Sequence, residues 1–192
     1  AGEIEIWALP TRVTALSIPK RDGRPRKVAK VAANEVSTCA VQCSGRVWQW
    51  GHSFPQPTRV SFPGTEELRR ANGLSTSPNG MYVIPRQTRI MDVACTRNHN
   101  VAVSTSGEVY TWCSSISPSE VTPELVGALR GKHVTAVSAG LTHAAAVADT
   151  GDLFTWDVST DGTGNASGLG HLNLVDGNAT TKKIPQSVHT LK

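Results

Sequence analysis

The six-residue stretch Gly107–Trp112, GEVYTW, recurs along the chain with a constant spacing between its glycine and its tryptophan. The further copies are GRVWQW at 45–50, GDLFTW at 151–156 and GEIEIW at 2–7. Four of the five tryptophans of the 192-residue chain hold the last position of this stretch: Trp7, Trp50, Trp112 and Trp156. Recurrence at a fixed phase indicates a repeat protein, in which each unit packs against its neighbours.

Two further signatures keep a fixed place relative to each tryptophan. A valine stands 19 residues before three of them, at Val31, Val93 and Val137. A Pro-x-x-Val signature follows every copy, at Pro10/Val13, Pro57/Val60, Pro123/Val126 and Pro185/Val188, and Leu16, Leu129 and Leu191 extend three of these. The intervals between successive tryptophans are 43, 62 and 44 residues, so the longest interval predicts an insertion at about 65–86.

Within each unit the local sequence favours short β-strands joined by turns. Small and β-branched residues at Cys39–Val41, Val101–Val103 and Ala145–Val147 suit a closely packed sheet. The GEVYTW-type stretch that follows alternates between two faces, as a strand does. Only Thr65–Ala71 and Glu120–Leu129 favour short helices. Several short strands in each unit of 40 to 60 residues predict a β-propeller rather than a helical solenoid.

The whole pattern, V-x-A-G-x-x-H, a small apolar strand, a turn, G-x-V-Y-x-W and P-x-x-V-x-x-L, resembles the regulator of chromosome condensation repeat. The segment Ala136–Trp156 matches it best. Asp92–Trp112 follows the same pattern with Thr96 in place of the glycine. Val31–Trp50 diverges most, because Asn34 replaces the glycine and Ser37 the histidine.

This resemblance implies an all-β fold, a partial β-propeller of the regulator of chromosome condensation type. We expect about three complete four-stranded antiparallel blades plus flanking part-blades, in one domain over 1–192. The repeat units are expected at about 2–44, 45–106, 107–150 and 151–192. The family fold has seven blades, and an incomplete ring exposes sheet edges with unpaired backbone groups. We therefore expect completion by sequence outside this chain, by a second chain or by self-association.

The residues at fixed repeat positions are expected to serve structure rather than chemistry. His99 and His143 share one slot, which favours a buried imidazole that bonds a neighbouring turn over a ligand or general base. The identical phase of Trp7, Trp50, Trp112 and Trp156 favours packing between blades over a base-stacking platform. Gly45, Gly107 and Gly151 supply the turn before each GEVYTW-type strand. No metal, cofactor or catalytic residue is predicted, because no phosphate loop, nucleophile elbow or metal-ligand spacing occurs.

A basic stretch at 20–30 is the candidate partner-binding site. Its positive residues are Lys20, Arg21, Arg24, Arg26, Lys27 and Lys30, against the single acid Asp22. Such a density of charge can bind phosphate backbones or an acidic protein surface, and a solvated inter-blade loop is the structural alternative. No aromatic residue interleaves with the charges, so sequence-specific RNA binding is not supported.

Composition places the chain among ordinary globular proteins, with 39% hydrophobic and 18% charged residues and a net charge of +4. No apolar run approaches the roughly 18 residues of a membrane span, and the first residues do not resemble a signal peptide. The four scattered cysteines favour reduced thiols and an intracellular protein, nuclear or cytoplasmic, with an organelle left open.

The function expected from these features is a non-enzymatic protein-protein interaction scaffold, free or within a larger assembly. Its variable loops at 20–27, 65–86 and 157–181 would recognise a protein partner. One alternative, implied by the resemblance, is a guanine-nucleotide exchange factor for a Ran-type small GTPase. Another is chromatin or RNA attachment through the basic loop 20–30.

Overall fold

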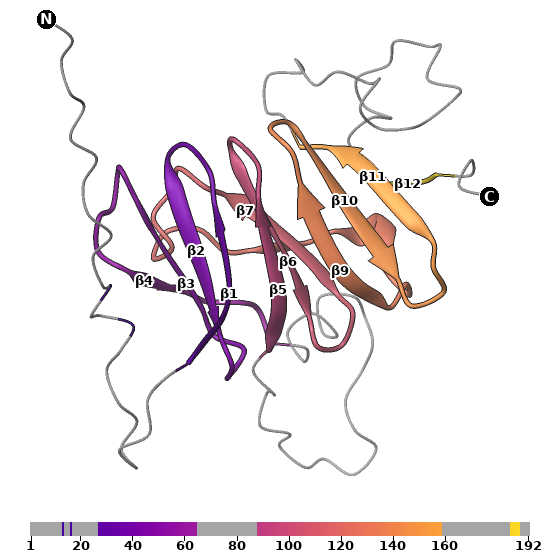
Figure 1. Cartoon of the computed structure of the whole chain (residues 1–192), viewed down its shortest axis with the longest axis horizontal. Coiled ribbons are helices and arrows are strands. Elements are labelled where there is room, and N and C mark those ends of the chain that lie inside the picture. The colour runs from indigo at the N-terminus through magenta and orange to yellow at the C-terminus, as the bar shows by residue number, and fades with distance from the viewer. Residues whose placement is uncertain (1–12, 14–15, 17–26, 65–87, 159–184, 189–192) are drawn as a thin grey trace, which may run out of the picture.

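The computed structural model describes Val13, Leu16 and residues 27–64, 88–158 and 185–188. These residues form three four-stranded sheets that lie side by side in chain order (Figure 1). Every pair of neighbouring strands within a sheet is antiparallel. Each sheet takes its strands in sequence order, so each is a meander built from one contiguous segment. Each segment begins in one of the expected repeat units and ends in the next.

The three sheets have the same four-part layout. The first sheet contains β1 (Val28–Ala33), β2 (Ser37–Gln42), β3 (Val47–Gly51) and β4 (Thr58–Val60). The second contains β5 (Ile90–Cys95), β6 (His99–Ser104), β7 (Val109–Cys113) and β8 (Glu124–Leu125). The third contains β9 (Val134–Ala139), β10 (His143–Ala148), β11 (Leu153–Asp157) and β12 (Gln186–Ser187). The small apolar runs predicted as strands lie in β2, β6 and β10, as expected.

The helix predicted over Glu120–Leu129 is wrong. Glu124–Leu125 is a strand, and Gly127–Leu129 forms one turn of 3-10 helix. Pairing of β8 with β7 overrides the weak helical preference of this segment, which contains Pro123 in its middle. The second predicted helix, Thr65–Ala71, and the insertion around it lie outside the described residues. None of the described residues belongs to a helix with the length and apolar content of a membrane span.

Alternation along the strands gives each sheet two faces, and both faces of the second sheet are buried. One face packs on the first sheet in a cluster that includes Cys39, Val41, Val47, Val93, Tyr110 and Trp112. The other packs on the third sheet in a cluster that includes Val101, Val103, Val109, Ala144, Phe154 and Trp156. Burial of each such large side chain contributes roughly 1.5–3 kcal/mol. The core of this fold is therefore two sheet-to-sheet interfaces.

Backbone hydrogen bonds also join neighbouring sheets at the turn that precedes β3 and β7. The Gly45 carbonyl accepts from the Ile90 amide at 3.0 Å, and the Gly107 carbonyl accepts from the Val134 amide at 3.1 Å. Both glycines have φ of +81°, a conformation that side chains disfavour. A Cβ on Gly45 would lie 2.7 Å from the Arg89 Cβ. These glycines therefore give the turn its shape and let the next sheet approach it.

Candidate functional site: the open face of the first sheet

The second sheet packs on the first through side chains that stand opposite one another across its strands. Two such rows are Val93–Ala102–Tyr110 and Cys95–Asn100–Trp112. The same repeat positions of the first sheet give the rows Val31–Ala40–Trp48 and Ala33–Thr38–Trp50. Directly paired residues of antiparallel strands project on the same face. The first sheet therefore presents, on its side away from the second sheet, the face that the second sheet uses for inter-sheet packing.

This face of the first sheet is apolar and partly exposed. The Val31 side chain is 70% exposed and Val28 is 41% exposed. Trp50 is half-buried, whereas Trp112 and Trp156, which hold the same repeat position, are each 2% exposed. Exposed apolar surface that gathers on one face marks an interaction site more often than scattered apolar residues do.

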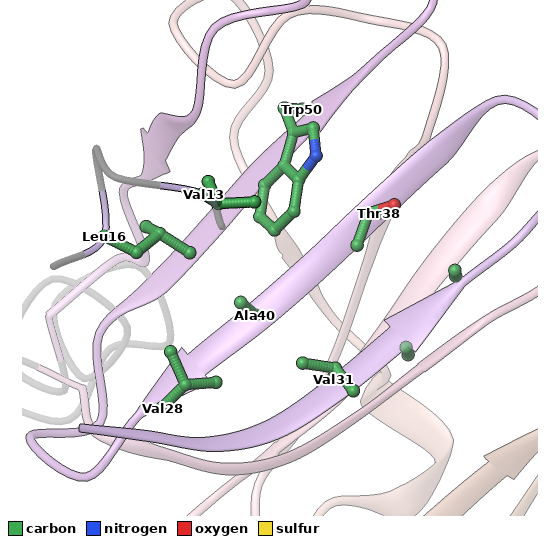
Figure 2. A pocket seen from close by; sticks show the side chains of 9 residues that line it. Val13, Leu16, Val28, Val31, Thr38, Ala40 and Trp50 are labelled. Atoms are coloured by element: carbon green, nitrogen blue, oxygen red, sulfur yellow. The ribbon is translucent and has the colours of Figure 1, made fainter. Parts of the chain in front are cut away.

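The face contains a pocket of about 530 Å³. Its walls are Val28, Val31, Ala32 and Ala33 from β1, Thr38 and Ala40 from β2, Trp50 from β3, and the more N-terminal Val13 and Leu16. Figure 2 shows Val28 and Val31 on one side of Ala40, with Val13, Leu16 and Trp50 on the other. Almost all of this lining is hydrocarbon, so the pocket is suited to burying apolar side chains.

Val13 and Leu16 line this pocket on the first sheet. Their repeat equivalents occupy the corresponding place on the third sheet. The equivalents, Val126 and Leu129, belong to the cluster between the second and third sheets. Leu129 is 3% exposed and Leu16 is 6% exposed. Val126 and Leu129 are therefore inter-sheet residues, and Val13 and Leu16 already contact the open face.

Comparison with known proteins decides the family. No family model matches the sequence. RUG3, an RCC1 domain-containing mitochondrial protein of Arabidopsis thaliana, is 26% identical over 80% of this chain and 32% of its own length. The ultraviolet-B receptor UVR8 of the same plant is 31% identical over 97% of this chain and 38% of its own length. The chain belongs to the regulator of chromosome condensation (RCC1) repeat family. It spans well under half the length of these curated relatives.

The RCC1-type fold is a β-propeller, and each of the three sheets is one blade of such a propeller. The crystal structure of Prp20p from Saccharomyces cerevisiae matches over 91% of this chain and 44% of the Prp20p chain, with a TM-score of 0.56 and 15% sequence identity. Prp20p has binding properties toward Gsp1p and histones. The first, second and third sheets are therefore three consecutive RCC1 blades.

A pair of buried hydrogen bonds in the interface between the first and second blades forms a polar bridge. This bridge holds Trp112, the repeat tryptophan of the second blade. The Trp112 indole N–H donates to the Gln49 side-chain oxygen at 2.8 Å. The Gln49 amide nitrogen donates to the Ser114 carbonyl at 2.8 Å. Gln49 is fully buried, so both bonds are shielded from water. The bridge fixes the indole orientation and ties β3 to the end of β7.

Replacement of Gln49 by leucine is expected to lower the free energy of unfolding by about 1–3 kcal/mol, because two buried polar groups lose their partner. Gln42 is the matched control. Its side chain is also buried, at 2% exposure, and its amide makes no hydrogen bond with the described residues. Gln42→Leu is therefore expected to be neutral or stabilising in the same urea-unfolding measurement. Equal losses in the two variants would show that the bridge contributes nothing specific.

Asn34 makes a second link between the first and second blades. Its side-chain oxygen accepts from the backbone amides of Val36 at 2.9 Å and Ser37 at 2.7 Å. Its amide nitrogen donates to the Thr96 carbonyl at 2.5 Å. The asparagine that replaces the RCC1 glycine here therefore closes its own turn and reaches the neighbouring blade.

The histidine slot differs between the second and third blades. In the second blade, Thr96 and His99 close the turn through two hydrogen bonds of 3.0 Å between the Thr96 hydroxyl and the His99 backbone. In the third blade, a Cβ on Gly140 would lie 2.6 Å from the His143 ring, so the imidazole packs over that glycine. In the second blade the Thr96 hydroxyl therefore closes the turn by hydrogen bonds. In the third blade the histidine ring instead packs closely over the glycine.

The basic stretch falls mostly outside the described residues, which include Lys27 and Lys30. The Lys30 ammonium lies 3.7 Å from the Asp92 carboxylate of the second blade. One of the six candidate charges is thus already paired within the protein, and partner binding by this stretch stays a prediction. Trp7 and nearly all of the variable loops predicted to bind partners also lie outside the described residues. Within the described ranges no cluster of three or more potential metal ligands occurs.

Sequence reasoning missed the open face, the Gln49 bridge and the role of Asn34. The only sequence signal for the face was the alignment of Val31 and Trp50 with residues that the other repeats bury. A residue's exposure depends on what lies beside its sheet, and repeat alignment alone does not give that. Gln49 has threonine in the same position of the second and third repeats, so its polar character carried no repeat-wide signal.

Proposed function

We propose that this chain is the non-catalytic interaction scaffold of an RCC1-type propeller, whose open first-blade face is completed by a further blade of the same polypeptide. The observation that supports this is the apolar pocket on the open face of the first blade. On the second and third blades the preceding blade covers the equivalent face. Apart from the Thr38 hydroxyl and the Trp50 indole N–H, the lining side chains are hydrocarbon and bind by burial. The proposed contact is therefore structural packing that holds the rim loops of the ring in place.

The expected occupant is the inner two-stranded hairpin of a preceding RCC1 repeat. Three features of the chain support this choice. Val13 and Leu16 already lie on the face in the manner of Val126 and Leu129. Trp50 has the same repeat position as Trp112 and Trp156, and a preceding blade buries both of those side chains. The curated relatives extend well beyond the matched region, so further repeats within one polypeptide are available to this fold family.

An extended chain tests this proposal. A copy of residues 134–150 is fused in front of Gly2, so that Gly2 takes the repeat position of Gly151 and the first repeat gains an inner hairpin. The melting temperature is expected to rise by about 5 °C or more, because a new apolar interface is buried. Val31→Asp is expected to remove most of that gain, whereas Val36→Asp, a 40% exposed valine of the β1–β2 turn outside the pocket, is expected to leave it.

Two outcomes would overturn the proposal. An extended chain that melts at the temperature of the natural chain would show that the face does not accept an RCC1 hairpin. Sedimentation of the natural chain as a dimer that Val31→Asp dissociates would assign the face to a second copy of the chain. A shuffled version of the 134–150 extension controls for any effect of added length.

Guanine-nucleotide exchange is the second candidate function, since Prp20p binds the small GTPase Gsp1p. Release of labelled guanine nucleotide from a Ran-type GTPase is measured with the natural and the extended chain. The scaffold proposal predicts no acceleration by either chain at micromolar concentration. Acceleration by either would replace the scaffold with an exchange factor.

A further inference from the structure

We propose that Cys39 and Cys95 form an oxidation-sensitive thiol pair that closes to a disulfide between the first and second blades. The oxidant is a low-molecular-weight disulfide such as oxidised glutathione. The inference rests on the placement of these two side chains in one cluster between the blades and is independent of the proposed function.

The two thiols both belong to the interface between the first and second blades. Cys39 lies in the middle of β2, fully buried in the cluster that joins the two blades. Cys95 is the last residue of β5 and packs against the same cluster. Interaction with the Cys95 side chain and burial together raise the pKa of Cys39. The pair therefore consists of one enclosed thiol and one partner at the edge of the interface.

Exposure differs between the two members in the way that a stepwise oxidation requires. Cys95 is partly exposed. We therefore expect a small reagent to reach its sulfur from the edge of the interface. Cys39 is buried, so the reagent does not reach it and Cys95 is its sole route to oxidation. Among the described cysteines, Cys43 and Cys113 are also accessible in whole or in part.

Packing does not require sulfur at either position. The repeat equivalents of Cys39 are Val101 and Ala145, and the equivalents of Cys95 are Ala33 and Ala139. In this chain a thiol stands on each side of one interface, which the other repeats do not show. The same alignment makes alanine a conservative replacement at both positions.

The reaction balances in two exchange steps. The Cys95 thiolate attacks one sulfur of oxidised glutathione, forms a mixed disulfide and expels one glutathione thiolate. Cys39 loses its proton and attacks the Cys95 sulfur, which forms the Cys39–Cys95 bond and expels the second glutathione thiolate. Two protein thiols are oxidised, one reagent disulfide is reduced, and the two released protons end on two molecules of glutathione.

The product would fasten the first blade to the second by a covalent bond. A disulfide between segments far apart in the sequence restricts the unfolded chain and so raises thermal stability when it fits the native geometry. The 65–86 insertion lies between the two cysteines in sequence, so the bond also encloses it in a covalent loop. An oxidant would thus make the sheet that presents the open face more resistant to separation.

The test uses the full chain carrying Cys43→Ser and Cys113→Ser, incubated with oxidised glutathione well below its melting temperature. The expected product is lighter by about 2 Da, the two hydrogens lost in disulfide formation. Peptide mapping is expected to show Cys39 linked to Cys95. The melting temperature is expected to rise by about 5 °C or more and to return to the starting value with dithiothreitol.

The single variants separate the two steps. Cys39→Ala is expected to stop at a glutathione adduct on Cys95, and Cys95→Ala is expected to leave Cys39 as an unreacted thiol. Accumulation of the Cys95 adduct in the parent, with Cys39 still a free thiol, would overturn the proposal. So would a parent chain in which neither thiol reacts during prolonged incubation.

Discussion

Trp112→Ala is expected to lower the free energy of unfolding by about 3–5 kcal/mol, the usual cost of removing a large buried aromatic side chain. Trp112 is 2% exposed between the first and second blades, and its indole N–H bonds Gln49. The variant therefore creates a cavity in the interface and leaves the Gln49 oxygen without this donor. Urea unfolding followed by far-ultraviolet circular dichroism measures the loss.

Trp50→Ala is the matched control, since Trp50 holds the same repeat position on the open face. It is half-buried against the pocket rather than enclosed by a preceding blade. Its replacement is expected to cost less than about 2 kcal/mol. Losses of equal size at the two positions would contradict the assignment of an open face.

Gly45→Ala is expected to lower the free energy of unfolding by about 2–4 kcal/mol. The alanine would hold a φ near +81° and place its Cβ 2.7 Å from the Arg89 Cβ and 2.9 Å from the Arg89 Cα. The strained backbone costs about 1 kcal/mol, and displacement of the β5 entry adds about 1–3 kcal/mol. It also weakens the hydrogen bond from the Ile90 amide to the Gly45 carbonyl.

Gly151→Ala isolates the backbone part of that cost. Gly151 has φ of +86° in the equivalent turn of the third blade, and a Cβ there would meet no described atom within 4 Å. The variant is expected to lose about 1 kcal/mol in the same assay. A Gly45→Ala loss no larger than the Gly151→Ala loss would show that contact with the next blade adds nothing.

The repeat architecture could be predicted from the sequence because each blade is a local structure. Its four strands come from one contiguous segment, and the small and β-branched residues of runs such as Val101–Val103 favour a strand by themselves. Glu120–Leu129 shows the limit of local reasoning. Pairing of Glu124–Leu125 with β7 and the short turn Gly127–Leu129 replace the expected helix.

The candidate site could not be predicted in the same way, because it depends on relations between blades. Trp50 and Trp112 are equivalent in sequence, and only the presence or absence of a preceding sheet separates their environments. The Cys39–Cys95 pair brings two repeat positions that the alignment places in different slots into one cluster. Asn34 breaks the RCC1 pattern and gains a hydrogen bond to the Thr96 carbonyl that single-repeat reasoning does not reveal.

Fluorine NMR of the chain labelled with 5-fluorotryptophan tests the open face most directly. Each resonance is assigned with a single tryptophan-to-phenylalanine variant, and the shift change between H₂O and D₂O reports exposure of each indole. We predict a clear solvent shift for Trp50, almost none for Trp112 and Trp156, and loss of the Trp50 shift in the chain extended with residues 134–150. A Trp50 resonance in the natural chain as insensitive to solvent as that of Trp112 would contradict the account.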